Sequence, residues 1–310
     1  MWVLSGGLTR HYSTQSFLSG GCCGYDVTET MPPQQVVSDN NETFLVRHPV
    51  AAYFVLTFTI SWLGAVVVAA PHLMRHEPLP KLTGILMFPA MLIGPSLVGI
   101  MLTRIVDGRD GLRGLVSRML RWRLPVRWYA PLLVPPALVL TVLFSLKTFV
   151  SSSYAPNLFL MGILFGVPAG YLEEIGWMGY AFPKMHSQNN ALASSILLGL
   201  LWSIWHLPVI DYLGTATPHA TYWLPFFLAF TAAMTAMRVL ICWIYSNTNS
   251  VLLAQLMHVS STGSLVIFSA PRLTAGQEVM WYGLYATALW ATIVIVVNIF
   301  GKRLTRTRVQ

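Results

Sequence analysis

The sequence predicts an all-α polytopic membrane protein with about eight transmembrane helices that enclose an intramembrane polar site. Of its 310 residues, 55% are hydrophobic and only 10% are charged, whereas soluble domains contain about 25% charged residues. Apolar stretches recur along the chain, and each is close to the ~20 residues that a helix needs to cross a bilayer. The expected spans are 51–70, 84–104, 129–149, 157–182, 190–209, 223–245, 250–268 and 279–300.

Regions of different composition flank the apolar part of the chain. Residues 1–45 are polar and show no helical apolar period, so we expect a disordered cytoplasmic tail there. They also lack the charged start and apolar core of a signal peptide. A transmembrane domain is expected over 46–302, followed by a basic cytoplasmic tail over 303–310. Three cysteines, Cys22, Cys23 and Cys242, provide neither a disulfide framework nor a zinc-ligand spacing.

The positive charges indicate how the chain is oriented in the membrane. Most of the 19 Lys and Arg residues fall on one side of the expected spans, and Lys and Arg are enriched in cytoplasmic loops. Both termini are therefore predicted to be cytoplasmic in a multi-pass protein of the cell membrane.

The net charge of +8 could also indicate a protein that binds nucleic acid. We expect a lipid bilayer and no nucleic acid, because the arginine-rich connector alternates with apolar residues like an interfacial helix. Its arginines are Arg104, Arg109, Arg113, Arg118, Arg121, Arg123 and Arg127.

Two adjacent glutamates, Glu173 and Glu174, interrupt the fourth apolar stretch. An ionisable side chain costs roughly 2.5–3.5 kcal/mol at the centre of a membrane helix, and such residues usually mark functional sites. The alternative is a helix that ends at Gly170, with both glutamates in an ordinary aqueous loop. We favour a functional site, because further polar residues lie at compatible depths on neighbouring spans.

Those further residues are His206 on the fifth span, Arg238 on the sixth, and His258 with Thr262 on the seventh. His258 and Thr262 are four residues apart and share a helix face. With a rise of ~1.5 Å per residue, the glutamates, both histidines and the arginine lie roughly 12–24 Å from the cytoplasmic helix ends. Since the hydrocarbon core is ~30 Å thick, they can converge within it.

Carboxylate and imidazole side chains together suit hydrolysis. A carboxylate accepts a proton from water while a histidine orients that water or shares the proton transfer. A second histidine with a neighbouring hydroxyl can stabilise the oxyanion that develops on a peptide carbonyl. The same set, Glu173, His206 and His258, also matches a His2Glu zinc site with water in the open position. The sequence leaves metal-free hydrolysis and hydrolysis assisted by a divalent metal such as zinc as open alternatives.

Three motifs in this order resemble the type II CAAX prenyl proteases, also called the CPBP or Abi family of intramembrane proteases, which includes lysostaphin-resistance-like proteins. The resemblance covers about 158–265. Its first motif, E-E-x-x-x-R, is similar to Glu173 through Met178. The second, an aromatic residue followed by x-x-x-H, is similar to Trp202 through His206, and the third, H-x-x-x-N, to His258 through Thr262.

The resemblance implies an intramembrane endopeptidase acting on a membrane-associated peptide, prenylated or of bacteriocin type. It implies that Glu173 and His206 activate water, that His258 and Thr262 polarise the scissile carbonyl, and that Glu174 supports them. Two positions depart from the family pattern, since Met178 replaces an arginine and Thr262 replaces an asparagine.

Arg238 is the basic residue expected well inside a span, so we predict that it pairs with Glu174 in place of the missing arginine. The alternative is that Arg238 extends to the membrane interface and anchors the sixth span.

Two other functions of the protein also remain open. One is a catalytically weak family member that acts as a binding or self-immunity protein. The other is a proton-coupled transporter, which the absence of two similar halves disfavours.

Overall fold

The apolar stretches form long helices that pack side by side. A computed structural model describes residues 44–186 and 190–305, and within them every regular element is helical. Five helical segments are long and apolar enough to cross a membrane: Pro49–Leu73, Lys81–Val106, Val126–Phe149, Ala220–Thr248 and Ala275–Phe300. Two shorter apolar helices, Ala191–Trp205 and Val251–Ile267, lie among them. The all-α polytopic membrane fold is confirmed.

The α-helices in chain order are α1 (Phe44–Arg47), α2 (Pro49–Leu73), α3 (Lys81–Met91), α4 (Ile93–Val106), α5 (Gly108–Met119), α6 (Val134–Phe149), α7 (Gly162–Gly176), α8 (Phe182–His186), α9 (Ala191–Trp205), α10 (Trp223–Thr248), α11 (Val251–Ile267) and α12 (Ala275–Phe300). Short 3-10 or π-helical segments connect several of them: η1 (Val126–Trp128), η2 (Ala130–Leu133), η3 (Ser152–Tyr154), η4 (Trp177–Ala181), η5 (Leu207–Tyr212) and η6 (Ala220–Tyr222).

Two of the expected spans are interrupted. The second is divided at Leu92 into α3 and α4, close to Pro89 and Pro95, each of which lacks a backbone donor. The fourth continues from α7 through a π-helical turn, Trp177–Ala181, into α8. This turn follows the glutamate pair directly, and π-helical turns occur frequently at functional sites.

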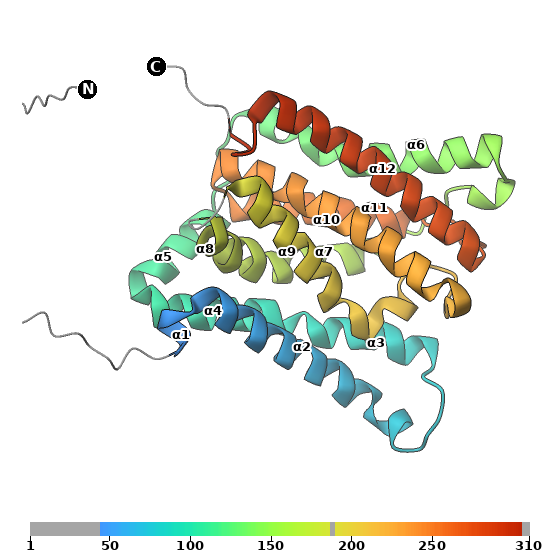
Figure 1. The fold of residues 1–310 in the computed structure, drawn as a ribbon, viewed down its shortest axis with the longest axis horizontal. Helices are drawn as coiled ribbons and strands as arrows, with labels where there is room; N and C mark the ends of the chain where they lie inside the picture. The colour runs from blue at the N-terminus through green and yellow to red at the C-terminus, as the bar shows by residue number, and fades with distance from the viewer. Residues whose placement is uncertain (1–43, 187–189, 306–310) are drawn as a thin grey trace, which may run out of the picture. The chain divides into compact units, whose positions relative to one another are not determined.

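The helices lie in three groups (Figure 1). One side of the molecule contains α2, α3 and α4, and the opposite side contains α6 and α12. Between them lie α7, α9, α10 and α11, the helices that carry the polar residues expected at the site. Among the apolar segments long enough to span, α10 is the most deeply buried. The polar residues are therefore surrounded by other helices rather than by lipid.

Glycines bring α7 and α11 into close contact. A Cβ atom at Gly166 would lie 2.9 Å from the Gly263 backbone, and one at Gly170 would lie 2.7 Å from the Val259 nitrogen. Small residues of this kind allow membrane helices to approach closely. The contact fixes the helix that carries both glutamates against the helix that carries His258 and Thr262.

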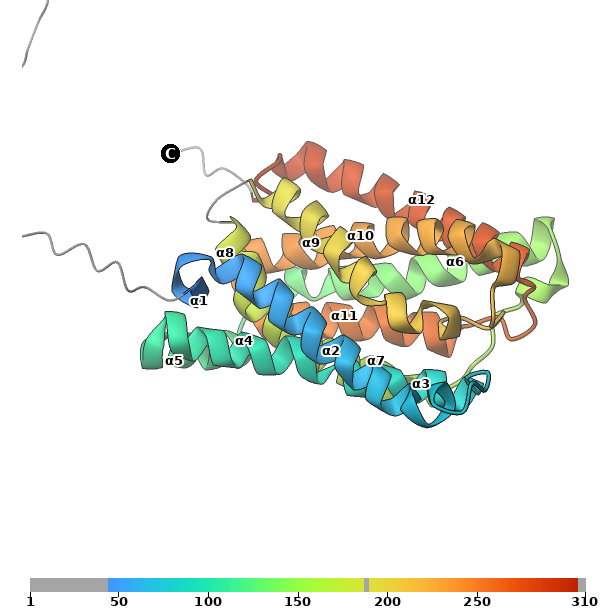
Figure 2. The ribbon, with the colours of Figure 1, turned by 60° about the horizontal axis from the view of Figure 1, so that its bottom comes forward.

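Basic residues gather at one end of the helix bundle. The amphipathic helix α5 lies there, together with α8 and the C-terminal end of α12 (Figure 2). Arg118 holds α5 to the bundle by donating to the Tyr245 hydroxyl at 2.6 Å and to the Gly179 carbonyl at 2.9 Å. The expected disordered tail, except for its last two residues, and the end of the basic tail lie outside the described residues.

Candidate active site

Glu173 lies on α7 and is fully buried. Its Oε2 atom accepts hydrogen bonds from the indole nitrogens of Trp202, at 2.6 Å, and Trp177, at 3.1 Å. Its Oε1 atom has no hydrogen-bond partner among the described residues. The carboxylate is therefore held by one oxygen, and its other oxygen is available to a ligand.

Glu174 is equally buried but has a different environment. Both of its oxygens lie 2.7 Å from Arg238 Nη1, and Oε1 also lies 2.7 Å from His258 Nδ1. A buried carboxylate is stable when it is paired in this way. Glu174 therefore links Arg238 on α10 to His258 on α11 and orients the His258 ring.

Arg238 provides the ion pair that was expected from the sequence. The side chain is fully buried, and its guanidinium carbon lies 4.1 Å from the centroid of the Trp202 ring. This is a short cation–π distance. The Met178 sulfur, at the position of the family's arginine, accepts a weak hydrogen bond from the Cys242 thiol at 3.8 Å. Arg238 thus supplies from α10 a positive charge that the motif on α7 lacks.

His206 follows the last residue of α9 and is 5% exposed. Its Nδ1 atom lies 2.8 Å from the Trp202 carbonyl oxygen. A neutral ring in this contact carries its proton on Nδ1, which leaves Nε2 as an acceptor. The rings of Phe88 and Phe230 pack against the imidazole. The geometry fixes the ring orientation and leaves one nitrogen able to take a proton from water.

His258 and Thr262 lie one turn apart on α11. The His258 Nδ1 atom is occupied by Glu174, so its Nε2 atom is the one left for a substrate. When doubly protonated, the ring donates from Nε2 and is stabilised by the Glu174 carboxylate. The charges of Glu173, Glu174, Arg238 and this protonated histidine then sum to zero within the membrane.

A cavity of about 300 Å³ brings five of these residues together. Glu173, Trp202, His206, His258 and Thr262 line its polar part. The remaining wall is mostly apolar and includes Gly84, Ile85, Phe88, Phe159, Phe165, Val209, Leu213, Phe230, Met234, Leu265 and Val266. Glu174 and Arg238 are not part of this lining. The residues that line the cavity can therefore contact a ligand, whereas Glu174 and Arg238 hold them in place from outside it.

The metal-assisted alternative would use Glu173, His206 and His258 as ligands. No group of three or more His, Cys, Asp or Glu side chains in residues 44–186 and 190–305 is arranged to hold a metal ion. Glu173, His206 and His258 nevertheless line one common cavity. Metal-assisted hydrolysis stays a prediction for experiment, and the chemistry proposed below uses the side chains alone.

The sequence indicated Trp202 only as part of a motif and did not identify Trp177 as a contributor. Trp177 follows Glu173 by four residues, the spacing that places two side chains on one helix face. That spacing is the signal that could have identified it. The bond from Trp202 crosses between helices and could not be predicted from spacing.

Comparisons with known proteins match the part of the chain that contains these residues. A family model described as "Type II CAAX prenyl endopeptidase Rce1-like" matches residues 155–263, which include both glutamates, both histidines, Arg238 and Thr262. The chain is also 25% identical over 230 residues to "CAAX prenyl protease 2" of Methanococcus maripaludis. That match covers 66% of this chain and 80% of the archaeal protein.

Proposed function

We propose that this chain, whose matches support membership of the CPBP family of type II CAAX-type endopeptidases, hydrolyses a peptide bond of a membrane-associated substrate. One observation carries this proposal. A buried carboxylate, Glu173, presents an oxygen without a protein partner to a cavity that also contains His206 and His258. Prenylated peptides and bacteriocin-type peptides are the proposed substrates.

The reaction begins with water bound between Glu173 and His206. As the water oxygen attacks the carbonyl carbon, its proton passes to this pair, which acts as general base. The carbonyl oxygen becomes an oxyanion that accepts hydrogen bonds from His258 Nε2 and the Thr262 hydroxyl. The same proton then moves to the leaving nitrogen as the carbon–nitrogen bond breaks, giving a carboxylic acid and an amine.

Glu173→Gln tests the mechanism. The amide keeps the size of the side chain and one acceptor oxygen but cannot take the proton from water, so we expect turnover to fall by about 10²–10⁴-fold. His206→Ala should cause a comparable loss, and the double variant should be little worse, because residues that act as a unit are not additive. Turnover is measured with purified protein and a panel of membrane peptides, with unchanged melting temperature as the check on folding.

Glu77→Gln is a matched control, because Glu77 is an exposed carboxylate that is not part of the cavity lining. Full activity of Glu173→Gln would contradict the assigned role, and complete loss with Glu174→Gln alone would exchange the two assignments. Activity that is abolished by a chelator and restored by zinc would support the metal-assisted alternative. Peptide binding without cleavage by the native protein would support the binding or immunity function.

We also propose an orientation in the cell membrane with both termini in the cytoplasm. Most described basic residues lie at the bundle end that contains α5 and α8, as the positive-inside rule requires of a cytoplasmic face. The cavity extends from Glu173 toward the opposite end, where α9 and α11 finish and α3 begins. Substrate then reaches the site from the extracytoplasmic side.

A further inference from the structure

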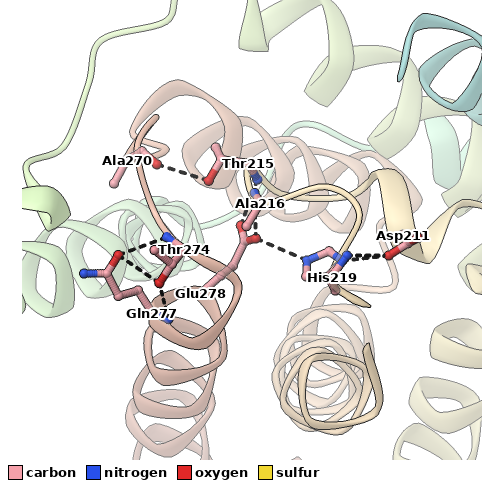
Figure 3. A network of polar contacts seen from close by, with 8 residues as sticks. All are labelled: Asp211, Thr215, Ala216, His219, Ala270, Thr274, Gln277 and Glu278. Carbon is pink, nitrogen blue, oxygen red and sulfur yellow. Dashed lines mark hydrogen bonds and ion pairs between the residues drawn. The ribbon is translucent and has the colours of Figure 1, made fainter. Parts of the chain in front are cut away.

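A second buried polar cluster lies beyond the cavity, at the start of α12. Glu278 is 2% exposed, and neither the proposed chemistry nor the family motifs use it. Its Oε1 atom accepts the Thr215 amide at 2.9 Å, and its Oε2 atom accepts the Ala216 amide at 3.0 Å. Oε2 also lies 3.2 Å from His219 Nε2 (Figure 3). One carboxylate therefore binds three groups of the segment between η5 and η6.

His219 extends this cluster to Asp211. The imidazole is fully buried, and its Nδ1 atom lies 3.2 Å from Asp211 Oδ1, which also accepts the His219 amide at 2.8 Å. Figure 3 shows the ring between the two carboxylates. Only a doubly protonated ring donates to both of them. The Phe226 ring stacks on the imidazole with centroids 3.7 Å apart, which fixes its plane.

The segment held by this cluster is a wall of the active-site cavity. Leu213, Gly214 and Thr215 line the cavity, whereas Glu278 and His219 lie behind them and do not. The backbone passes close to the carboxylate at Gly214, where φ is +83° and a Cβ atom would lie 2.2 Å from Glu278 Oε1. Glycine is therefore required there both by conformation and by space.

We propose that Glu278 is a positioning residue that fixes Leu213–Thr215 as the wall selecting the apolar side chain of the substrate. The proposal rests on the proposed peptidase function. Most of the other lining residues lie on the helices α3, α7, α9, α10, α11 and α12, which packing already fixes, whereas Leu213, Gly214 and Thr215 belong to a connecting segment. A helix-start carboxylate that served only the helix dipole would need no contact with that segment. Here its oxygens bind the amides that adjoin the cavity lining.

A cysteine-labelling experiment tests whether Glu278 holds the wall. Leu213→Cys is introduced into full-length protein carrying Cys22→Ser and Cys23→Ser, since the remaining Cys242 is fully buried. Glu278→Gln replaces one acceptor oxygen with an amide NH2 that faces backbone donors. We expect maleimide labelling of position 213 to become about tenfold faster. The loss of one charge-assisted hydrogen bond makes opening of the segment more frequent by about this factor. Glu77→Gln is the control that should leave the rate unchanged, and an equally unchanged rate in Glu278→Gln would overturn the proposal.

Substrate selectivity tests whether the wall acts on the substrate. Two peptides that differ only in an Ala or a Phe next to the scissile bond are compared by kcat/KM. A displaced wall should change the ratio between them by about fivefold or more through KM, while kcat for the better peptide stays within about threefold. General destabilisation would reduce kcat equally for both peptides. An unchanged ratio would show that the wall does not select.

Two further variants keep the proposal testable if Glu278→Gln does not fold. Leu213→Ala and Leu213→Phe change the wall itself and leave the polar cluster intact. They should shift the peptide ratio in opposite directions, and no shift in either would overturn the proposal. If native protein cleaves neither peptide, the proposed function fails separately. Labelling still tests the wall in that event, and peptide affinities measured by fluorescence anisotropy replace kcat/KM.

Discussion

Arg238 is the residue on which the charge balance of the site depends. Its guanidinium meets both oxygens of Glu174 at 2.7 Å, and Glu174 in turn contacts His258. Removing one member of a buried ion pair leaves an uncompensated charge, which costs about 3–5 kcal/mol. The effect should reach His258 because the two contacts share one carboxylate.

We therefore expect Arg238→Met to reduce both turnover and melting temperature strongly. Adding Met178→Arg should restore much of both, because position 178 lies one turn after Glu174 and can present a guanidinium to the same carboxylate. Turnover and thermal unfolding are measured on all three proteins. Arg113→Met is the control, since Arg113 is exposed on α5 and pairs only with Asp110 among the described residues. If Arg238→Met were as stable and active as native protein, Arg238 would be an anchor rather than a partner of Glu174.

Thr262 has a smaller expected role. Its side chain lines the cavity one turn beyond His258, in the position of the family's asparagine. Thr262→Ala should slow turnover by up to the ~10²–10³-fold typical of losing one oxyanion donor, whereas Thr262→Asn should retain activity. Thr292→Ala removes a hydroxyl that bonds only within α12 and should have little effect. An unchanged rate in Thr262→Ala would assign oxyanion stabilisation to His258 alone.

At this scale, the sequence predicted which residue types are buried but only part of what they contact. The pairing of Arg238 with Glu174 followed from charge compensation, because two buried carboxylates need a cation. The indole donors to Glu173 depend on how α9 packs against α7, which no local pattern encodes. The functional roles of the site residues remain predictions.

At the scale of elements, the contact between α7 and α11 sets the geometry of the site. Gly166 and Gly170 place the two helix backbones within van der Waals distance of each other. Glu173 and Glu174 lie one turn beyond Gly170, and His258 lies on the facing helix. A wider separation of these helices would therefore lengthen the Glu174–His258 contact.

Gly170→Leu should separate the helices and lower both melting temperature and turnover, with an expected cost of about 1–3 kcal/mol for overpacking. Gly283→Ala on α12 is the matched control, because a Cβ atom there has no heavy atom within 4 Å. Alanine also favours a helix over glycine, so this control should be neutral or slightly stabilising. Thermal unfolding in the same detergent compares them, and equal stability of Gly170→Leu and native protein would argue against the close contact.

The long apolar stretches predicted most helices within a few residues, since length and composition determine a membrane span. The division at Leu92 and the π-helical turn at Trp177–Ala181 were not predicted. Both depend on where backbone groups find partners in neighbouring helices. Proline positions indicate such interruptions but do not fix them.

At the scale of the whole molecule, the cavity and most basic residues lie toward opposite ends of the bundle. Intact cells should show this with a membrane-impermeant maleimide in the Cys22→Ser, Cys23→Ser background. Met74→Cys, at an 81% exposed position beyond α2, should be labelled from outside. Arg113→Cys on α5 should be labelled only after permeabilisation. The reverse pattern, or a reporter fused after Gln310 that is active only outside the cell, would overturn the orientation.

The cavity also occupies only one part of the length of the helix bundle. Buried side chains fill the bundle between the glutamates and the end that contains α5 and α8. They are Trp177, Met178, Tyr180 and Cys242, each no more than 2% exposed. A cell membrane holds an electrical potential worth about 2.3 kcal/mol per elementary charge for each 100 mV. Water that enters the cavity from one face and stops at these buried side chains does not form a continuous path for ions across the membrane. We therefore expect that the cavity can admit water for the proposed hydrolysis without letting ions cross the membrane.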